Sequence, residues 1–532
     1  MSLPTIQTGE KDDVPSTRLI TRDDVDRLRS TILEKEKRQT LKVILNEHGN
    51  EPLFEYIKGY TTPFLIPPNH ARQKEFIAAF HAAVASRLGQ DAADAGARQL
   101  EKYYYVSTTD HYGPLHHPWV LNFNLAAAGA YLEHDDPDLK NIITLACSNV
   151  SLNNFSFPRG FEFLTAPGGA VRHERLSFLP SNAHSYPVFD FRAYTTADLK
   201  KMKILLHEMT GRREVAKTVT ARVEEILDDI YGRDDVLQCK NYADQVTKTN
   251  FLLWQRLCPG TEKKSINFIY VEQERIVADL FITHHLTEPT ILHKMLFDTA
   301  VSHQFIQHFD GLPESFSTVK GTGTYLFWYV VPTCKKHRLR LWRENGFLVA
   351  EGGKYRIPLT PEGIREGIES GVLLPSVLLT FLTMACYYGV TCLGGMGQTS
   401  YMPKIKDAYI ALNRMYGEEE NIRMAEHMQP RYLGGEVTAA FVGGPHDIFA
   451  PASSIDLLIY ATHSFPCVVD KTKKITLQEA LDLLLPEDYP LHYFKKDMDP
   501  ILARISSRDI AKLTGLDRKI DPCAFLPEEL ST

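Results

Sequence analysis

The segment TTDHYGPLHHP, residues 108–118, carries side chains that could perform acid–base chemistry. Asp110, His111, His116 and His117 fall within eight residues, next to a Gly-Pro pair. Imidazole exchanges protons near pH 7, an aspartate can orient it, and both groups can also bind a metal ion. A turn whose polar residues only cap a helix has the same composition. Residue types alone therefore leave an active site, a metal site and a turn open.

A second polar segment is ACSNVSLNNFSF, residues 146–157. Its small hydroxyl and amide side chains can hydrogen-bond a polar ligand but cannot transfer protons strongly near pH 7. A solvated loop would have the same composition. The candidate substrate-binding residues in this segment are Ser148, Asn149, Ser151 and Asn153.

A third segment, GGMGQTSY at residues 394–401, resembles a phosphate-binding glycine loop. It lacks the Gly-Lys-Ser/Thr ending of a P-loop, so it does not indicate a particular cofactor, and close backbone packing explains its glycines equally well. Farther along, His446 beside Asp447 could join a catalytic relay with a partner from elsewhere. The candidate residues of the third segment are Gly395, Gly397, Gln398 and Tyr401.

A predicted β-α-β unit positions the first two segments. Residues 102–109 and 141–148 are rich in β-branched and aromatic residues, and residues 118–136 between them have a helical pattern that begins at Pro118. Such a crossover joins parallel strands and is almost always right-handed. Parallel strands end at one edge, so the loops 108–117 and 148–156 should be neighbours where open α/β sheets bind ligands.

The whole chain is predicted to be an α/β protein with a Rossmann-like parallel core sheet. A chain of 532 residues is too long to fold around one hydrophobic core. We divide it into a helical N-terminal region (1–100), the Rossmann-like region (101–415) and a mixed C-terminal region (416–532). A β-meander is inserted in the core, because residues 339–360 alternate like strands around the turns Asn345-Gly346 and Gly352-Gly353.

Composition argues against several classes of partner. The 59 basic and 66 acidic residues give a net charge of −7 without a basic stripe, so nucleic acid is not expected as the main partner. Residues 371–395 are uncharged, but Pro375 and Gly389 interrupt them, which favours a buried helix and strand over a membrane span. The eight cysteines form no C-x-x-C pair and are predicted to be reduced thiols, and the polar N-terminus predicts a cytoplasmic protein. The oligomeric state is left open.

The order of these segments resembles that of the bacillithiol synthases, the enzymes assigned to the addition of cysteine in bacillithiol synthesis. The resemblance covers roughly residues 100–415. Its landmarks are the Ala, Leu and Phe positions of the second segment, together with Gly113, Pro118, Pro375, Gly395, Gly397 and Tyr401. The family's acidic, His-bearing second loop is replaced here by neutral residues, and its glutamate in the third loop by Gln398. The first loop carries Asp110 and the histidines instead. The family's long C-terminal coiled coil has no counterpart after residue 415.

The resemblance implies an enzyme that condenses or transfers a small amino-acid-like substrate to an amine or similar acceptor, forming a C–N bond. His111 or His116 would act as general base and Asp110 would orient it, while Thr109, His117, His446 and the residues of the second and third segments would hold the substrate. The helix start at His117 and Pro118 could hold a carboxylate or phosphate. Two alternatives are a non-catalytic small-molecule-binding protein on the same fold and a metal-dependent enzyme with Asp110, His111 and His116 as ligands.

Overall fold

A computed structural model describes residues 18–62, 69–115, 117–154, 159–183, 185–261, 264–331, 338–428, 432–461 and 463–527. Its centre is a four-stranded parallel sheet with the strand order β11-β1-β2-β5. The strands are β1 (Tyr105–Ser107), β2 (Asn141–Ala146), β5 (Asn267–Glu272) and β11 (Thr391–Leu393). Helix α6 (Pro118–Glu133) connects β1 to β2, which pair in parallel at Ser107 and Thr144. The predicted α/β class and β-α-β unit are confirmed.

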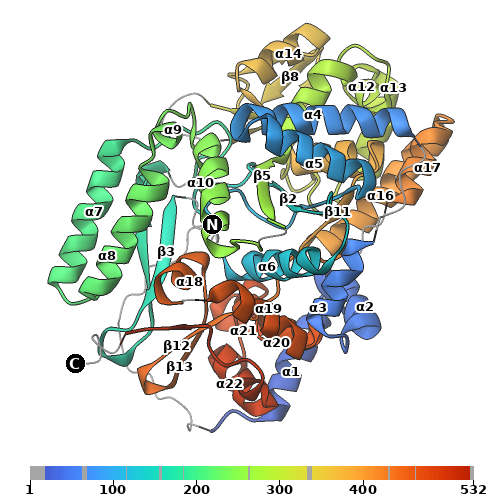
Figure 1. Cartoon of the computed structure of the whole chain (residues 1–532). Coiled ribbons are helices and arrows are strands. Elements are labelled where there is room, and N and C mark those ends of the chain that lie inside the picture. The colour runs from blue at the N-terminus through green and yellow to red at the C-terminus, as the bar shows by residue number, and fades with distance from the viewer. Residues whose placement is uncertain are drawn as a thin grey trace.

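Helices cover both faces of this sheet (Figure 1). Because side chains alternate along a strand, Val106 and Ile143 pack with α4 (His70–Leu88) and α5 (Gln90–Lys102) on one face. On the other face, Ile142 packs with α6 and α10 (Tyr242–Leu257). Both faces of the strands are therefore buried, and only the strand ends are open to a ligand.

The strand order contains a change of direction. The chain passes from β1 to β2 and β5 on one side, and it returns much later to the opposite side of β1 as β11. Residues that follow β1 and β11 therefore flank a crevice at the carboxyl edge of the sheet, which is where open α/β sheets bind their ligands.

The predicted β-meander is confirmed as a five-stranded antiparallel sheet with the order β10-β6-β7-β8-β9. Its strands are β6 (Phe327–Val330), β7 (Arg338–Glu344), β8 (Phe347–Ala350), β9 (Arg356–Pro358) and β10 (Leu373–Pro375). Asn345 and Gly346 turn between β7 and β8 with φ angles of 47° and 78°. Both central residues of this two-residue turn need positive φ, which explains the Asn-Gly sequence.

The apolar stretch 371–395 is folded into the protein core. It contributes β10, α15 (Val377–Phe381), the π-helix Leu382–Tyr387 and β11, and its residues from Leu373 to Met396 are almost all buried. No helix within the described ranges is long and apolar enough to cross a membrane.

The remaining elements surround this core. The N-terminal helices α1 (Arg22–Leu33), α2 (Gln39–His48) and α3 (Leu53–Lys58) contact C-terminal helices, and α2 and α3 also contact α16 (Gln398–Met415) and α6. The C-terminal elements are β12 (Phe441–Gly444), β13 (Ile448–Pro451), α18 (Ser454–Tyr460), α19 (Ser464–Lys474), α20 (Leu477–Asp482), α21 (Leu485–Asp488), α22 (Ser507–Thr514) and β14 (Ala524–Phe525). The others are β3 (Gly160–Thr165), β4 (Arg172–Ser177), α7 (Thr196–Gly211), α8 (Lys217–Ile226), α9 (Asp234–Leu237), α11 (Gln273–Leu280), α12 (Ile291–Phe297), α13 (Thr299–Phe309), α14 (Pro361–Glu369) and α17 (Glu419–His427).

Cys467 and Cys523 form a disulfide, so the prediction of eight reduced thiols is wrong for this pair. The parallel pairing of β14 with β12 brings Cys523 beside α19, where the Cα atoms of the two cysteines lie 5.9 Å apart. The partners are 56 residues apart, and no local pattern indicates the contact.

We expect Cys467→Ser to lower the free energy of unfolding by about 2–4 kcal/mol, because the disulfide restricts the unfolded chain. Urea unfolding of the variant and of Cys239→Ser, which removes a free cysteine, checks this. Alkylation of Cys467 and Cys523 in the unfolded protein without a reductant would contradict the pairing.

Candidate functional site

A cavity of about 690 Å³ lies at the carboxyl ends of β1, β2 and β11. All three predicted polar segments contribute to its wall. The predicted site residues that line it are Thr109, His111, Asn149, Ser151, Gly395, Gly397, Gln398 and Tyr401. Local pairing explains why the first two segments meet. The backbone N–H of Tyr112 donates to the carbonyl of Cys147 at 2.9 Å, and that of Cys147 donates to the carbonyl of Asp110 at 3.0 Å.

The third segment is joined to β1 through Gln398, the first residue of α16. The hydroxyl of Thr108 donates to the side-chain oxygen of Gln398 at 2.9 Å. The helix start that lines the cavity is therefore that of α16, at Gly395 and Gly397, rather than that of α6 as predicted. At the start of α6, His117 acts as the cap and accepts a hydrogen bond from the N–H of Trp119.

Other predicted residues lie away from the cavity wall. Ser148 and Asp110 are buried behind it, and Asn153 is exposed. His446 belongs to the turn Pro445–Asp447 in the separate sheet of β12 and β13, and its side chain lies outside the described part of the structure. His116 also lies outside the described residues.

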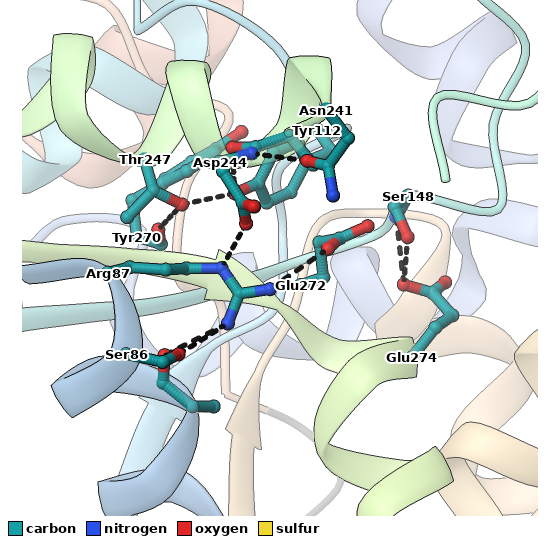
Figure 2. Close-up of polar contacts among 12 residues, drawn as sticks. Ser86, Arg87, Tyr112, Ser148, Asn241, Asp244, Thr247, Tyr270, Glu272 and Glu274 are labelled. Atoms are coloured by element: carbon teal, nitrogen blue, oxygen red, sulfur yellow. Dashed lines mark hydrogen bonds and ion pairs between the residues drawn. The ribbon is translucent and has the colours of Figure 1, made fainter. Parts of the chain in front are cut away.

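The neutral second loop covers a carboxylate that the sequence reasoning missed. Glu274, at the start of α11, accepts hydrogen bonds from the hydroxyl and the N–H of Ser148, both at 2.9 Å, and from the N–H of Asn149 at 3.2 Å. Figure 2 shows Ser148 turned toward Glu274. It also shows Arg87 between Asp244 and Glu272, the two carboxylates with which it forms ion pairs. Ser148 therefore fixes the loop to Glu274 instead of facing the cavity.

Arg338 supplies a cation to the cavity wall. It stands at the start of β7, and its guanidinium group donates to the backbone carbonyl and the side-chain oxygen of Asn149. The guanidinium carbon also lies 5.1 Å from the centre of the Trp328 ring. Burial lowers the pKa of Arg338, but an arginine remains charged in proteins. The end of β2 therefore offers a fixed site for a carboxylate or phosphate.

Two glutamates line the same cavity. Glu314 is exposed, whereas the carboxylate of Glu436 lies against the third loop and accepts a hydrogen bond from the N–H of Met396. Burial raises the pKa of Glu436 to about 7. The cavity therefore holds groups of both signs.

Comparison with models of protein families and with curated proteins found no match. Among the described residues, no cluster of three or more His, Cys, Asp and Glu side chains could hold a metal ion. The predicted ligand His116 lies outside those residues.

Burial shifts the pKa values of Asp110 and His111 in opposite directions. The Asp110 carboxylate accepts a hydrogen bond from the hydroxyl of Tyr270 at 3.1 Å, and burial raises its pKa to about 7. Burial lowers the pKa of His111 to about 4, so its imidazole is neutral at pH 7. A neutral imidazole can both donate and accept a hydrogen bond, but with this pKa it is a weak base. Within the described structure, Asp110 faces Tyr270 rather than the His111 ring.

Sequence signals for the missed residues exist but are weak. Glu274 is the last residue of the stretch NFIYVEQE, whose pattern is typical of a strand and a turn but does not indicate a position in the parallel sheet. Glu436 follows Gly434-Gly435, a pair that indicates close backbone contact without naming the partner. Arg338 stands one residue before the predicted hairpin, and nothing in the pattern connects it with Asn149.

The raised pKa of Asp110 predicts a pH-dependent difference between wild type and Asp110→Asn. An unfolded aspartate ionises near pH 4, whereas folded Asp110 keeps its proton up to about pH 7. The free energy of unfolding of the wild type therefore falls as the pH rises from about 4 to about 7, whereas that of the variant does not fall for this reason. We expect similar unfolding free energies near pH 3.5, below the unfolded pKa, and a more stable variant at pH 8, by up to about 4 kcal/mol. Urea unfolding at both pH values checks this, and parallel pH profiles would contradict it.

Proposed function

We propose that this chain is an enzyme with a Rossmann-like core that binds a small amino-acid-like molecule in the cavity and joins it to an amine or similar acceptor. The product would contain a new C–N bond, as the resemblance to bacillithiol synthases implies. In this reaction the acceptor nitrogen would lose a proton and replace one oxygen of the substrate's carboxyl group. A nucleoside triphosphate would be needed as co-substrate, so that the displaced oxygen leaves with a phosphate group. The observation that carries the proposal is the meeting of all three polar segments at one cavity, beside the change of direction between β1 and β11.

The charges on the cavity wall favour a zwitterionic substrate. Arg338 lies over the end of β2 and Glu436 over the end of β11, with β1 between them. A zwitterion could place its carboxylate at Arg338 and its ammonium group near Glu436, so that each group meets the opposite charge.

The neutral groups between these charges would position the substrate. His111 follows β1 and contributes a neutral imidazole, while Asn149, Ser151 and Gln398 add hydrogen-bonding groups from the neighbouring loops. In this proposal His111 contacts the substrate as a hydrogen-bonding group, because its lowered pKa makes it a poor proton acceptor at pH 7.

Room for an acceptor is available next to the cavity. A second cavity of about 570 Å³ opens beside the first. The two share part of their walls, formed by Glu314, Ser315, Thr322, Gly397 and Tyr401. A reaction that joins two molecules needs two adjoining binding sites, and the two cavities would serve as these sites.

A thermal-shift panel of L-amino acids, thiols and nucleotides tests the substrate class. We expect an amino acid or a close analogue to raise the melting temperature of the wild type, because a ligand of the folded state stabilises it. Arg338→Gln should raise the dissociation constant of that ligand at least tenfold, because a charge-assisted hydrogen bond is lost. This corresponds to a loss of about 1.4 kcal/mol or more of binding free energy.

The matched control is Arg343→Gln on the same strand, because Arg343 hydrogen-bonds Thr299 and does not line the cavity. No stabilisation by any amino acid, or equal binding by Arg338→Gln and wild type, would contradict the proposed substrate class. Mass spectrometry of the bound ligand incubated with amine acceptors and a nucleoside triphosphate then looks for a C–N product. Binding without any product would favour the non-catalytic binding protein.

A further inference from the structure

Glu436 is held at the cavity wall by a segment that adds to the edge of the parallel sheet. Just beyond β11, the N–H of Gly394 donates to the carbonyl of Tyr432 at 2.9 Å, and the N–H of Gly434 donates back to the carbonyl of Gly394 at 2.8 Å. On the other side of Glu436, the N–H of Val437 donates to the carbonyl of Trp119 at 3.1 Å. The backbone is thus fixed on both sides of this glutamate.

The two glycines before Glu436 allow its segment to reach the strand ends. A Cβ atom at Gly434 would come within 2.4 Å of the side chain of Leu393, and one at Gly435 within 2.7 Å of that of Thr109. Neither position has room for a side chain, so the Gly-Gly pair brings Glu436 directly over the ends of β1 and β11.

The backbone of Glu436 itself is left-handed, with φ of 59°. This region is unfavourable for a residue with a Cβ atom, and such strain persists only where the surroundings impose it. The conformation lays the carboxylate on Gly395, where a Cβ atom would come within 2.8 Å of it. The N–H of Met396 then donates to the same carboxylate.

The carboxylate of Glu436 lacks a close counter-charge. No ion pair joins it to a cation among the described residues, and burial raises its pKa to about 7 despite a weak attraction from Arg38. A cation placed against it from within the cavity would favour its ionised form. The site is therefore complementary to a positively charged group of a ligand.

We infer that Glu436 binds the ammonium group of the substrate and thereby sets its orientation and class, with the amine over β11 and the carboxylate at Arg338 over β2. This inference rests on the proposed function for its substrate. Glu436 would thus provide a carboxylate beside the third segment, where Gln398 is neutral. The group that binds the amine is then the carboxylate of Glu436.

Isothermal titration calorimetry with matched ligands tests the inference. The probes are the twenty common amino acids, their N-acetyl derivatives, which lack the ammonium group, and ethanolamine and putrescine, which lack the carboxylate. We expect wild type to prefer an amino acid over its N-acetyl derivative at least tenfold. Glu436→Gln should lose this preference through weaker binding of the amino acid. Glu344→Gln, which changes an exposed glutamate that lines neither cavity, should keep it.

A second variant separates recognition from folding. Glu436→Gly removes the carboxylate and also relieves the left-handed strain, so we expect it to melt at or above the wild-type temperature and still to lose the preference for the free amine. Titration in two buffers of different ionisation enthalpy near pH 7 adds another readout. Wild type should release part of a proton on binding, because the ammonium group favours ionised Glu436. Glu436→Gln should not.

The possible results distinguish this inference from the proposed function. Amino-acid binding that is unchanged in both Glu436 variants would overturn the role of Glu436 and leave the substrate class standing. Binding of putrescine or ethanolamine alone, lost in Glu436→Gln, would support Glu436 and overturn the amino-acid substrate. No binding by any probe would overturn both. Proton release could also come from the other titratable groups near Glu436, which are Asp488, Tyr401, His111 and Glu314, so its loss in Glu436→Gln is required.

Discussion

The parallel pairing of β1 with β2 on one side and β11 on the other is the constraint on which the site depends. β1 has only three residues, and tyrosines on both faces hold it in place: Tyr104 donates to the carbonyl of Tyr388, and the hydroxyls of Tyr105 and Tyr131 share a hydrogen bond of 2.5 Å. With β1 fixed, the residues after it must lie between the residues after β2 and β11. A shift of β1 by one residue would move Thr109 and His111 away from the cavity together.

The charged groups at this edge are immobilised before any ligand arrives. Glu274 accepts hydrogen bonds from the second loop, Arg338 donates to Asn149, and Glu436 accepts from Met396. A buried charge is costly unless hydrogen bonds or an opposite charge stabilise it. These contacts reduce that cost and fix the orientation of each group. A ligand then meets dipoles and charges already in position, which is the arrangement that favours binding and catalysis.

Local patterns were enough to predict the β-α-β unit, the adjacency of the first two loops and the hairpin at Asn345-Gly346, because each depends on neighbours in the sequence. Contacts between distant segments could not be predicted in this way. The position of β5 beside β2 brings Glu274 under the second loop, yet nothing within residues 267–274 specifies a neighbouring strand. Burial is equally non-local: the lowered pKa of His111 depends on side chains packed around it, and no pattern within residues 108–118 indicates them.

The neutral composition of the second and third loops therefore does not make the site neutral. Each loop is matched by a carboxylate from another part of the chain, Glu274 under Ser148 and Glu436 against Gly395. The two carboxylates differ in what surrounds them. Glu274 accepts hydrogen bonds from several groups of the second loop and so serves the structure, whereas Glu436 faces the cavity without an ion pair in the described structure. A carboxylate can bind a ligand when it faces a cavity and when its charge is not already paired. Of these two carboxylates, Glu436 better meets both conditions.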